Sequence, residues 1–187
     1  MKHVILAVLV LALTLGEAEA QLNVGDKVPV FETLDQNGDP WSLADHLDEA
    51  SYLVVYFYPA AFTGGCTKQA CAYRDLKGEL AEAGAQVVGV SGDEAENLEL
   101  FALEHQLNFT LLSDEKGNIA ELFGVPRNDG GSIDRDIQGN THHLVRGTTI
   151  QRWTFVLDRN GMLVYKDSEV DAAQDSQQVL EFLGSLN

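Results

Sequence analysis

The sequence predicts an α/β domain in which a mixed central β-sheet is flanked by helices. Residues 52–58, YLVVYFY, form a continuous apolar and aromatic run, which is typical of a strand buried on both faces. Strand-like and helix-like segments then alternate along the chain, as they do in α/β folds. Near the C-terminus, WTFVLD and MLVYKD flank the turn residues Asn160-Gly161 and predict an antiparallel hairpin.

The elements around the buried strand can be assigned in order. Before it, the strand-like pieces 28–33 and 40–43 stand on either side of the turn sequence DQNG. After it, Pro59 ends the run because proline cannot donate a hydrogen bond to a neighbouring strand. A long helix is then expected from Gly64 or Gly65 to about residue 83, because apolar side chains recur there at three- and four-residue steps.

The rest of the chain continues the alternation. Further strands are expected at 86–90 and 108–112, and further helices at 94–106, 117–123 and 172–183. Residues 127–148 are polar and glycine-rich with no clear period, so we expect a long loop there. The closing hairpin and terminal helix suit a thioredoxin-like fold, formed by one domain over residues 21–187.

Residues 1–20 predict a secretory signal peptide. A short basic start is followed by the apolar residues 4–15 and by the small-residue pattern AEA, which predicts a cut after Ala20. The alternatives are a buried N-terminal helix and an uncleaved anchor, but the run is shorter than the ~20 apolar residues that a membrane span needs. We therefore expect a secreted or periplasmic protein that has no membrane association after cleavage.

The composition excludes one class of partner. The 187 residues include 12 Lys and Arg against 29 Asp and Glu, for a net charge of −17. A surface this acidic repels phosphate backbones, so we expect no nucleic-acid partner.

Both cysteines, Cys66 and Cys71, lie in the stretch FYPAAFTGGCTKQACAYRD. A structural disulfide is the first alternative for an exported protein. However, a bridge that closes so small a loop removes little entropy from the unfolded chain. A domain of this length also has enough core to fold without a covalent link. The pattern therefore favours a chemical role for the two thiols.

Cys66 is expected in the first turn of the long helix, where unpaired N–H groups and the helix dipole favour a thiolate, the nucleophilic form. Thr63 precedes it by three residues and offers a hydroxyl that can donate and accept. Five residues along an intact helix separate two Cα atoms by roughly 8–9 Å. A disulfide needs at most ~7 Å. We therefore hypothesise that Cys66 and Cys71 bridge only when the intervening turn unwinds.

The pattern Pro59-x-x-x-Thr63-x-x-Cys66 resembles the active-site motif of the peroxiredoxins. Cys71 resembles the resolving cysteine of their bacterioferritin comigratory protein, or peroxiredoxin Q, subfamily, an atypical 2-Cys group. The segment IQRWTFVLDRNG is similar to the one that supplies the family's active-site arginine, here Arg152. The likeness extends over most of residues 21–187, including VGDKVPVFETLDQNG and VVGVSGDEAENLELFALEHQLNFTLLSDEKGNIAELFGV.

The resemblance implies a thiol-specific peroxidase for hydrogen peroxide and organic hydroperoxides. Cys66 would be the peroxidatic nucleophile and would become a sulfenic acid, which Cys71 would resolve to an intramolecular disulfide. Thr63 and Arg152 would stabilise the thiolate and the peroxide, and Pro59 would shield the site from water. A thioredoxin-like dithiol would reduce the disulfide, with no metal, haem or flavin. An intrachain resolving cysteine also removes the need for a dimer, so we expect a monomer.

Two other functions remain open from the residues alone. A thiol–disulfide oxidoreductase or redox sensor on the same fold would be expected to carry Cys-x-x-Cys, whereas this chain has a four-residue gap. An exported binding or chaperone-like module would consume no peroxide. His142-His143 could ligate a metal, but a tandem pair in a polar segment is more often solvated.

Overall fold

The strand predicted from YLVVYFY is β3 (Tyr52–Phe57), which lies inside a seven-stranded mixed sheet. The computed structural model describes residues 21–186, and the predicted signal peptide lies outside the described residues. The strand order is β2-β1-β5-β4-β3-β8-β9, with β3, β4 and β5 mutually parallel and the other strands antiparallel to their neighbours. The remaining strands of this sheet are β1 (Glu32–Asp35), β2 (Pro40–Ser42), β4 (Ala85–Ser91), β5 (Thr110–Ser113), β8 (Thr154–Asp158) and β9 (Leu163–Asp167).

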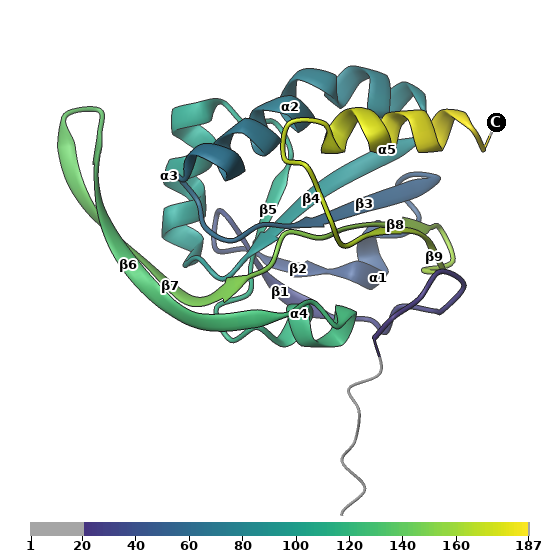
Figure 1. The fold of residues 1–187 in the computed structure, drawn as a ribbon, viewed down its shortest axis with the longest axis horizontal. Coiled ribbons are helices and arrows are strands. Elements are labelled where there is room, and N and C mark those ends of the chain that lie inside the picture. Colours follow the sequence, from purple (N-terminus) through teal and green to yellow (C-terminus); the bar gives the residue numbers. More distant parts are fainter. Residues whose placement is uncertain (1–20, 187) are drawn as a thin grey trace, which may run out of the picture.

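Helices cover both faces of the sheet (Figure 1). They are α1 (Leu43–His46), α2 (Gly64–Glu82), α3 (Ala95–His105), α4 (Asn118–Phe123) and α5 (Asp175–Gly184). Successive side chains of β3 alternate between two cores, as the two-residue period of a strand requires. Val54 and Tyr56 pack with side chains of α2, α3 and α5, whereas Val55 and Phe57 pack with those of α1 and α4. The prediction of a thioredoxin-like sandwich with a mixed sheet is confirmed.

The long helix α2 begins and ends close to the predicted residues. Thr63 has the extended backbone of an N-cap, with φ −89° and ψ 147°. At the other end, Gly84 adopts φ +79°, a left-handed conformation that glycine reaches without strain. The helix is therefore continuous through both cysteines. None of the helices within residues 21–186 is long and apolar enough to cross a membrane.

The prediction of a loop over residues 127–148 is wrong. Strands β6 (Arg127–Ile137) and β7 (Asn140–Ile150) pair antiparallel as a separate two-stranded hairpin, which extends from the body of the fold (Figure 1). The two turn residues, Gln138 and Gly139, have φ +51° and +82°, as a tight mirror-image hairpin turn requires. Few of its residues are buried, so the sequence lacks the apolar alternation that would have indicated strands.

Candidate active site

The loop between β3 and α2 is fixed by a buried carboxylate at the end of the neighbouring strand. Pro59 follows β3 after Tyr58, and the Ala61 N–H donates to Asp93 Oδ2 at 2.8 Å. The same oxygen accepts from Ser91 Oγ at 2.9 Å. Burial raises the pKa of Asp93, while the Ala61 and Ser91 hydrogen bonds oppose that rise. Phe62 adopts φ +60°, so the loop turns sharply just before the helix.

Cys66 occupies the third residue of α2, which is one of the positions whose N–H has no partner inside the helix. The first bond of the helix runs from the Thr67 N–H to the Thr63 carbonyl at 2.8 Å. The Cys66 side chain is only 1% exposed and packs with Tyr58, Ala61 and other members of the α2-side core. The thiol is therefore buried among apolar side chains at the positive end of a helix.

One cation reaches this thiol. Arg152 precedes β8 by two residues, and its Nη2 donates to Cys66 Sγ at 3.4 Å. A Cβ added at Gly65 would lie 3.4 Å from the same Nη2, so the guanidinium passes close to the backbone of the first turn. Fold topology thus brings together two predicted site residues that are 86 positions apart in the sequence.

Thr63 and Pro59 belong to the loop before Cys66, and within the described residues neither forms a hydrogen bond with its sulfur. The Thr63 hydroxyl donates to the Ala60 carbonyl at 3.0 Å, so it is turned towards its own loop. A hydroxyl that donates once still has lone pairs that can accept from a ligand. Pro59 is half-buried at the end of β3.

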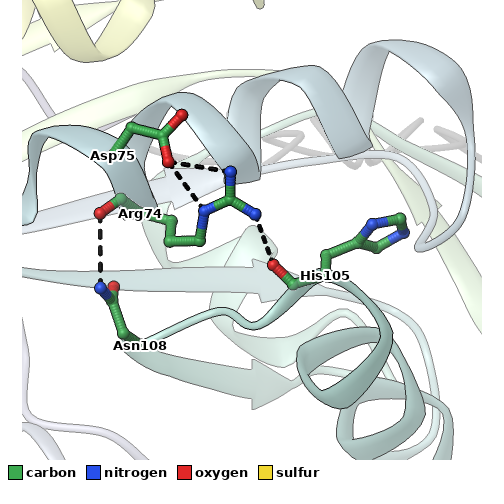
Figure 2. Close-up of polar contacts among 4 residues, drawn as sticks. All are labelled: Arg74, Asp75, His105 and Asn108. Carbon is green, nitrogen blue, oxygen red and sulfur yellow. Dashed lines mark hydrogen bonds and ion pairs between the residues drawn. The ribbon is translucent and has the colours of Figure 1, made fainter.

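Cys71 lies on the same helix, half-buried, and both cysteines are free thiols. Just beyond it, α2 is attached to the last residue of α3 and to the segment that follows, as Figure 2 shows. Arg74 Nη1 donates to the His105 carbonyl at 2.6 Å, and its Nη2 pairs with Asp75 at 2.8 Å. Asn108 Nδ2 donates back to the Arg74 carbonyl at 3.4 Å. These contacts fix the part of α2 that follows Cys71.

A buried polar network lies behind Arg152, and no local sequence pattern indicates it. Arg152 Nη1 also donates to Gln69 Oε1, and Gln69 Nε2 donates to Asp175 Oδ2 at 2.6 Å. The same carboxylate oxygen accepts from Tyr73 and Thr154 hydroxyls at 2.8 and 2.9 Å. In the sequence, Asp175 resembles an ordinary acidic residue in the first turn of a helix, which is favourable in any helix. No local pattern connects it with Gln69, because 106 positions separate the two residues.

The histidine pair that we considered for metal binding lies on the hairpin. His143 Nδ1 pairs with Asp134 Oδ1 at 2.7 Å, and both side chains are mostly exposed. Within residues 21–186, no group of three His, Cys, Asp or Glu side chains is arranged to hold a metal ion.

Comparison with known proteins agrees with this geometry. Residues 24–166 match the AhpC/TSA family. Chloroplastic peroxiredoxin Q of Sedum lineare is 40% identical over 169 residues, which cover 89% of this chain and 81% of that protein. Peroxiredoxin Bcp of Escherichia coli is 37% identical over 162 residues, or 87% of this chain and 96% of that protein.

Solved structures of related proteins show the same fold. Peroxidoxin BcpB from Mycobacterium tuberculosis matches with a TM-score of 0.75 at 34% identity, over 89% of this chain and 99% of that one. Peroxiredoxin Q of Xanthomonas campestris matches with a TM-score of 0.66 at 28% identity, over 83% and 90%. This chain therefore belongs to the AhpC/TSA family of peroxiredoxins, within the group that contains peroxiredoxin Q and Bcp.

Proposed function

We propose that this chain is a thiol peroxidase that reduces hydrogen peroxide and organic hydroperoxides through Cys66. Family membership supports the activity. The observation that carries the assignment of the nucleophile is the contact of Arg152 Nη2 with Cys66 Sγ at the N-terminus of α2. A cation and a helix terminus together stabilise a thiolate, which is the reactive form of cysteine.

In the first step, the Cys66 thiolate attacks one oxygen of the hydroperoxide. A new S–O bond forms as the O–O bond breaks, and the other oxygen leaves as water or an alcohol after it takes up a proton. Negative charge moves from sulfur to oxygen during this step. Arg152 and the unpaired N–H groups of the first turn are aimed at the place where that charge develops, so they stabilise the transition state. Thr63 can orient the peroxide through its hydroxyl, and Pro59 helps to keep water out.

In the second step, the Cys71 thiolate attacks the sulfenic sulfur of Cys66. The S–S bond forms, the S–O bond breaks, and the hydroxyl leaves as water. Because α2 is continuous from Gly64 to Glu82, the turn between the thiols has to unwind before they meet. A thioredoxin-like dithiol then returns both cysteines to thiols by disulfide exchange, at the cost of its own two electrons.

The test is peroxide consumption by the purified protein with a thioredoxin and its reductase as electron source. Cys66→Ser should abolish turnover because it removes the nucleophile. Cys71→Ser should retain one equivalent of fast peroxide reduction in a single turnover, but lose turnover with thioredoxin. Full activity in Cys66→Ser would overturn the assignment, and full turnover in Cys71→Ser would overturn the role of the second cysteine.

We further propose that residues 1–20 are a cleaved export signal and that the mature enzyme acts as a monomer in the periplasm or outside the cell. The basic–apolar–AEA order of the sequence supports the first statement. The presence of both cysteines on one helix supports a monomer, because no second subunit is needed to supply the resolving thiol. N-terminal sequencing of the protein from its native source should begin at Gln21, and light scattering of the mature chain should give one subunit.

A further inference from the structure

Asp175 is an acidic residue buried at a junction between three elements. It is 0% exposed and forms the first residue of α5. Its Oδ2 accepts three hydrogen bonds, two from α2 through Gln69 and Tyr73, and one from β8 through Thr154. Its Oδ1 has no hydrogen-bond partner within the described part of the chain. Burying a carboxylate costs desolvation free energy, and here one of its two oxygens is left without a partner among the described residues. We therefore asked which neighbouring group the carboxylate positions.

The neighbouring group is the side-chain amide of Gln69. Gln69 is fully buried, and its two ends bond in opposite senses: Oε1 accepts from Arg152, and Nε2 donates to Asp175. An amide can rotate to exchange its oxygen and nitrogen, and the exchanged form would direct N–H groups at the Arg152 cation. An acceptor on the Nε2 side prevents that exchange. Asp175 therefore determines which end of Gln69 faces Arg152.

We propose that Asp175 is a positioning residue that acts through Gln69 on Arg152 and holds the Cys66 turn of α2 folded until the thiol has been oxidised. The inference rests on the proposed peroxidase function. Gln69 and Tyr73 both lie on α2, on either side of Cys71. Their bonds to Asp175 attach this part of the helix to α5 and β8. The turn between the two cysteines cannot unwind without releasing Gln69 from both partners.

The hydrogen bond between Gln69 and Asp175 should therefore affect peroxide reduction and disulfide closure in opposite directions. While it is intact, Arg152 is aimed at Cys66 and peroxide reduction is fast. When it is broken, the turn unwinds more readily and disulfide closure is favoured. Burial raises the pKa of Tyr73 well above its ordinary value, so the Tyr73 hydroxyl remains a donor to Asp175 at every physiological pH.

An exchange of side chains gives the sharpest test. Gln69→Glu places a second carboxylate against Asp175, where two anions repel at hydrogen-bond distance. The double variant Gln69→Glu/Asp175→Asn again has one carboxylate and one amide, but the carboxylate is now at position 69 and the amide at position 175. The amide at position 175 can then donate to the carboxylate at position 69. Asp175→Asn alone weakens the acceptor but leaves the shape. Glu181→Gln, an exposed position on the same helix, is the control for removing one negative charge from α5.

The first measurement is hydrogen–deuterium exchange of the reduced proteins, which needs no enzymatic activity. Amides of residues 64–72 should exchange faster in Gln69→Glu and in Asp175→Asn than in the wild type. They should return towards wild-type protection in the double variant, and Glu181→Gln should be unchanged. Amides of β3 should stay protected throughout. Unchanged protection of residues 64–72 in Asp175→Asn, or equal loss of protection in β3, would overturn the proposal.

The second measurement separates the two steps by stopped-flow kinetics. In Asp175→Asn, sulfenic acid formation should slow by roughly tenfold, as expected when a charged hydrogen-bond acceptor is replaced by a neutral one. Disulfide closure in the same variant should be at least as fast as in the wild type. Slowing of both steps, or no recovery in the double variant relative to Gln69→Glu, would contradict a positioning role. If the wild type reduces no peroxide, the proposed function fails, and the exchange experiment still decides the role of Asp175.

Discussion

At the scale of single residues, the Arg152 side chain links the Cys66 thiol to the buried amide of Gln69. One guanidinium nitrogen donates to Cys66 Sγ and the other donates to Gln69 Oε1. The planar fork of arginine can make both contacts at once, whereas the single ammonium of lysine is a point charge on a flexible stem. Charge alone is therefore insufficient at this position.

Arg152→Lys should lower the second-order rate of peroxide reduction by roughly a hundredfold, the usual effect of removing one preorganised donor from a transition state. Competition kinetics or stopped-flow fluorescence would measure the rate. Arg159→Lys, in an exposed turn, is the matched control and should leave the rate unchanged. A wild-type rate in Arg152→Lys would show that net charge is enough.

The sequence indicates the residues of this site only where they fall in a local pattern. Thr63, Cys66 and Cys71 stand in one short segment, and Arg152 stands just before a recognisable strand. Asp175 belongs to no such pattern, because its contacts with Gln69 and Thr154 arise only when α5 packs against α2 and β8. Long-range polar contacts of this kind depend on the three-dimensional fold.

At the scale of elements, the β6–β7 hairpin is attached to the body partly through the main chain of β7. The Gly147 N–H donates to the Gly92 carbonyl at 2.8 Å, and Asn97 Nδ2 donates to the Val145 carbonyl at 2.7 Å. A Cβ added at Gly92 would lie 2.1 Å from the Thr148 carbonyl oxygen. Only glycine allows the hairpin and the end of β4 to approach so closely.

Two glycine-to-alanine changes should therefore have opposite effects on stability. Gly92→Ala should destabilise the protein by about 1–3 kcal/mol, because the hairpin has to move away from β4. Gly78→Ala, in the exposed interior of α2 with no atom near the new Cβ, should stabilise it by about 0.5–1 kcal/mol. Urea unfolding of both variants would measure these differences. Equal stability of the two variants would contradict the packing described for Gly92.

The elements that could be predicted are those with strong apolar patterns. β3 and β4 are nearly continuous apolar runs, and α2 and α3 carry apolar side chains at helical spacing, so their existence and approximate bounds followed from the sequence. The hairpin has four glycines and, apart from residues such as Ile137 and Leu144, little buried surface. Its strands are held by main-chain hydrogen bonds and by the Gln138-Gly139 turn, which leave a weak signature in the sequence.

At the scale of the whole molecule, three buried aspartates affect how stability depends on pH. Burial raises the pKa values of Asp93, Asp114 and Asp175 above 3.8 in the folded state. The folded protein then binds more protons than the unfolded chain between 3.8 and those raised values. Stability from these groups is therefore fully present below that window and falls as pH rises through it. The net charge of −17 acts in the same direction, because repulsion grows as carboxylates ionise.

Asp114 offers the clearest test, because it lies away from the active site. Its carboxylate accepts from the Ile119 and Ala120 N–H groups at the start of α4, at 3.1 and 2.9 Å. An asparagine at position 114 keeps one acceptor and cannot ionise. The advantage of the wild type over Asp114→Asn in free energy of unfolding should shrink from pH 4 to pH 7, because the raised pKa of the buried carboxyl makes its ionisation unfavourable in the folded state.

Urea unfolding at several pH values would measure this difference. Asp39→Asn, at an exposed turn, is the control for removing one negative charge. A wild-type advantage that grows between pH 4 and pH 7 would show that the hydrogen bonds at the start of α4 outweigh the cost of burying the charge.

Because both thiols lie on α2, the rate of disulfide closure should not depend on protein concentration. Closure of a bridge within one helix is a first-order event, so its rate does not depend on how often two protein molecules meet. A protein that needed a second subunit for this step would lose it on dilution. This chain should resolve its oxidised cysteine equally fast at nanomolar and at micromolar concentration.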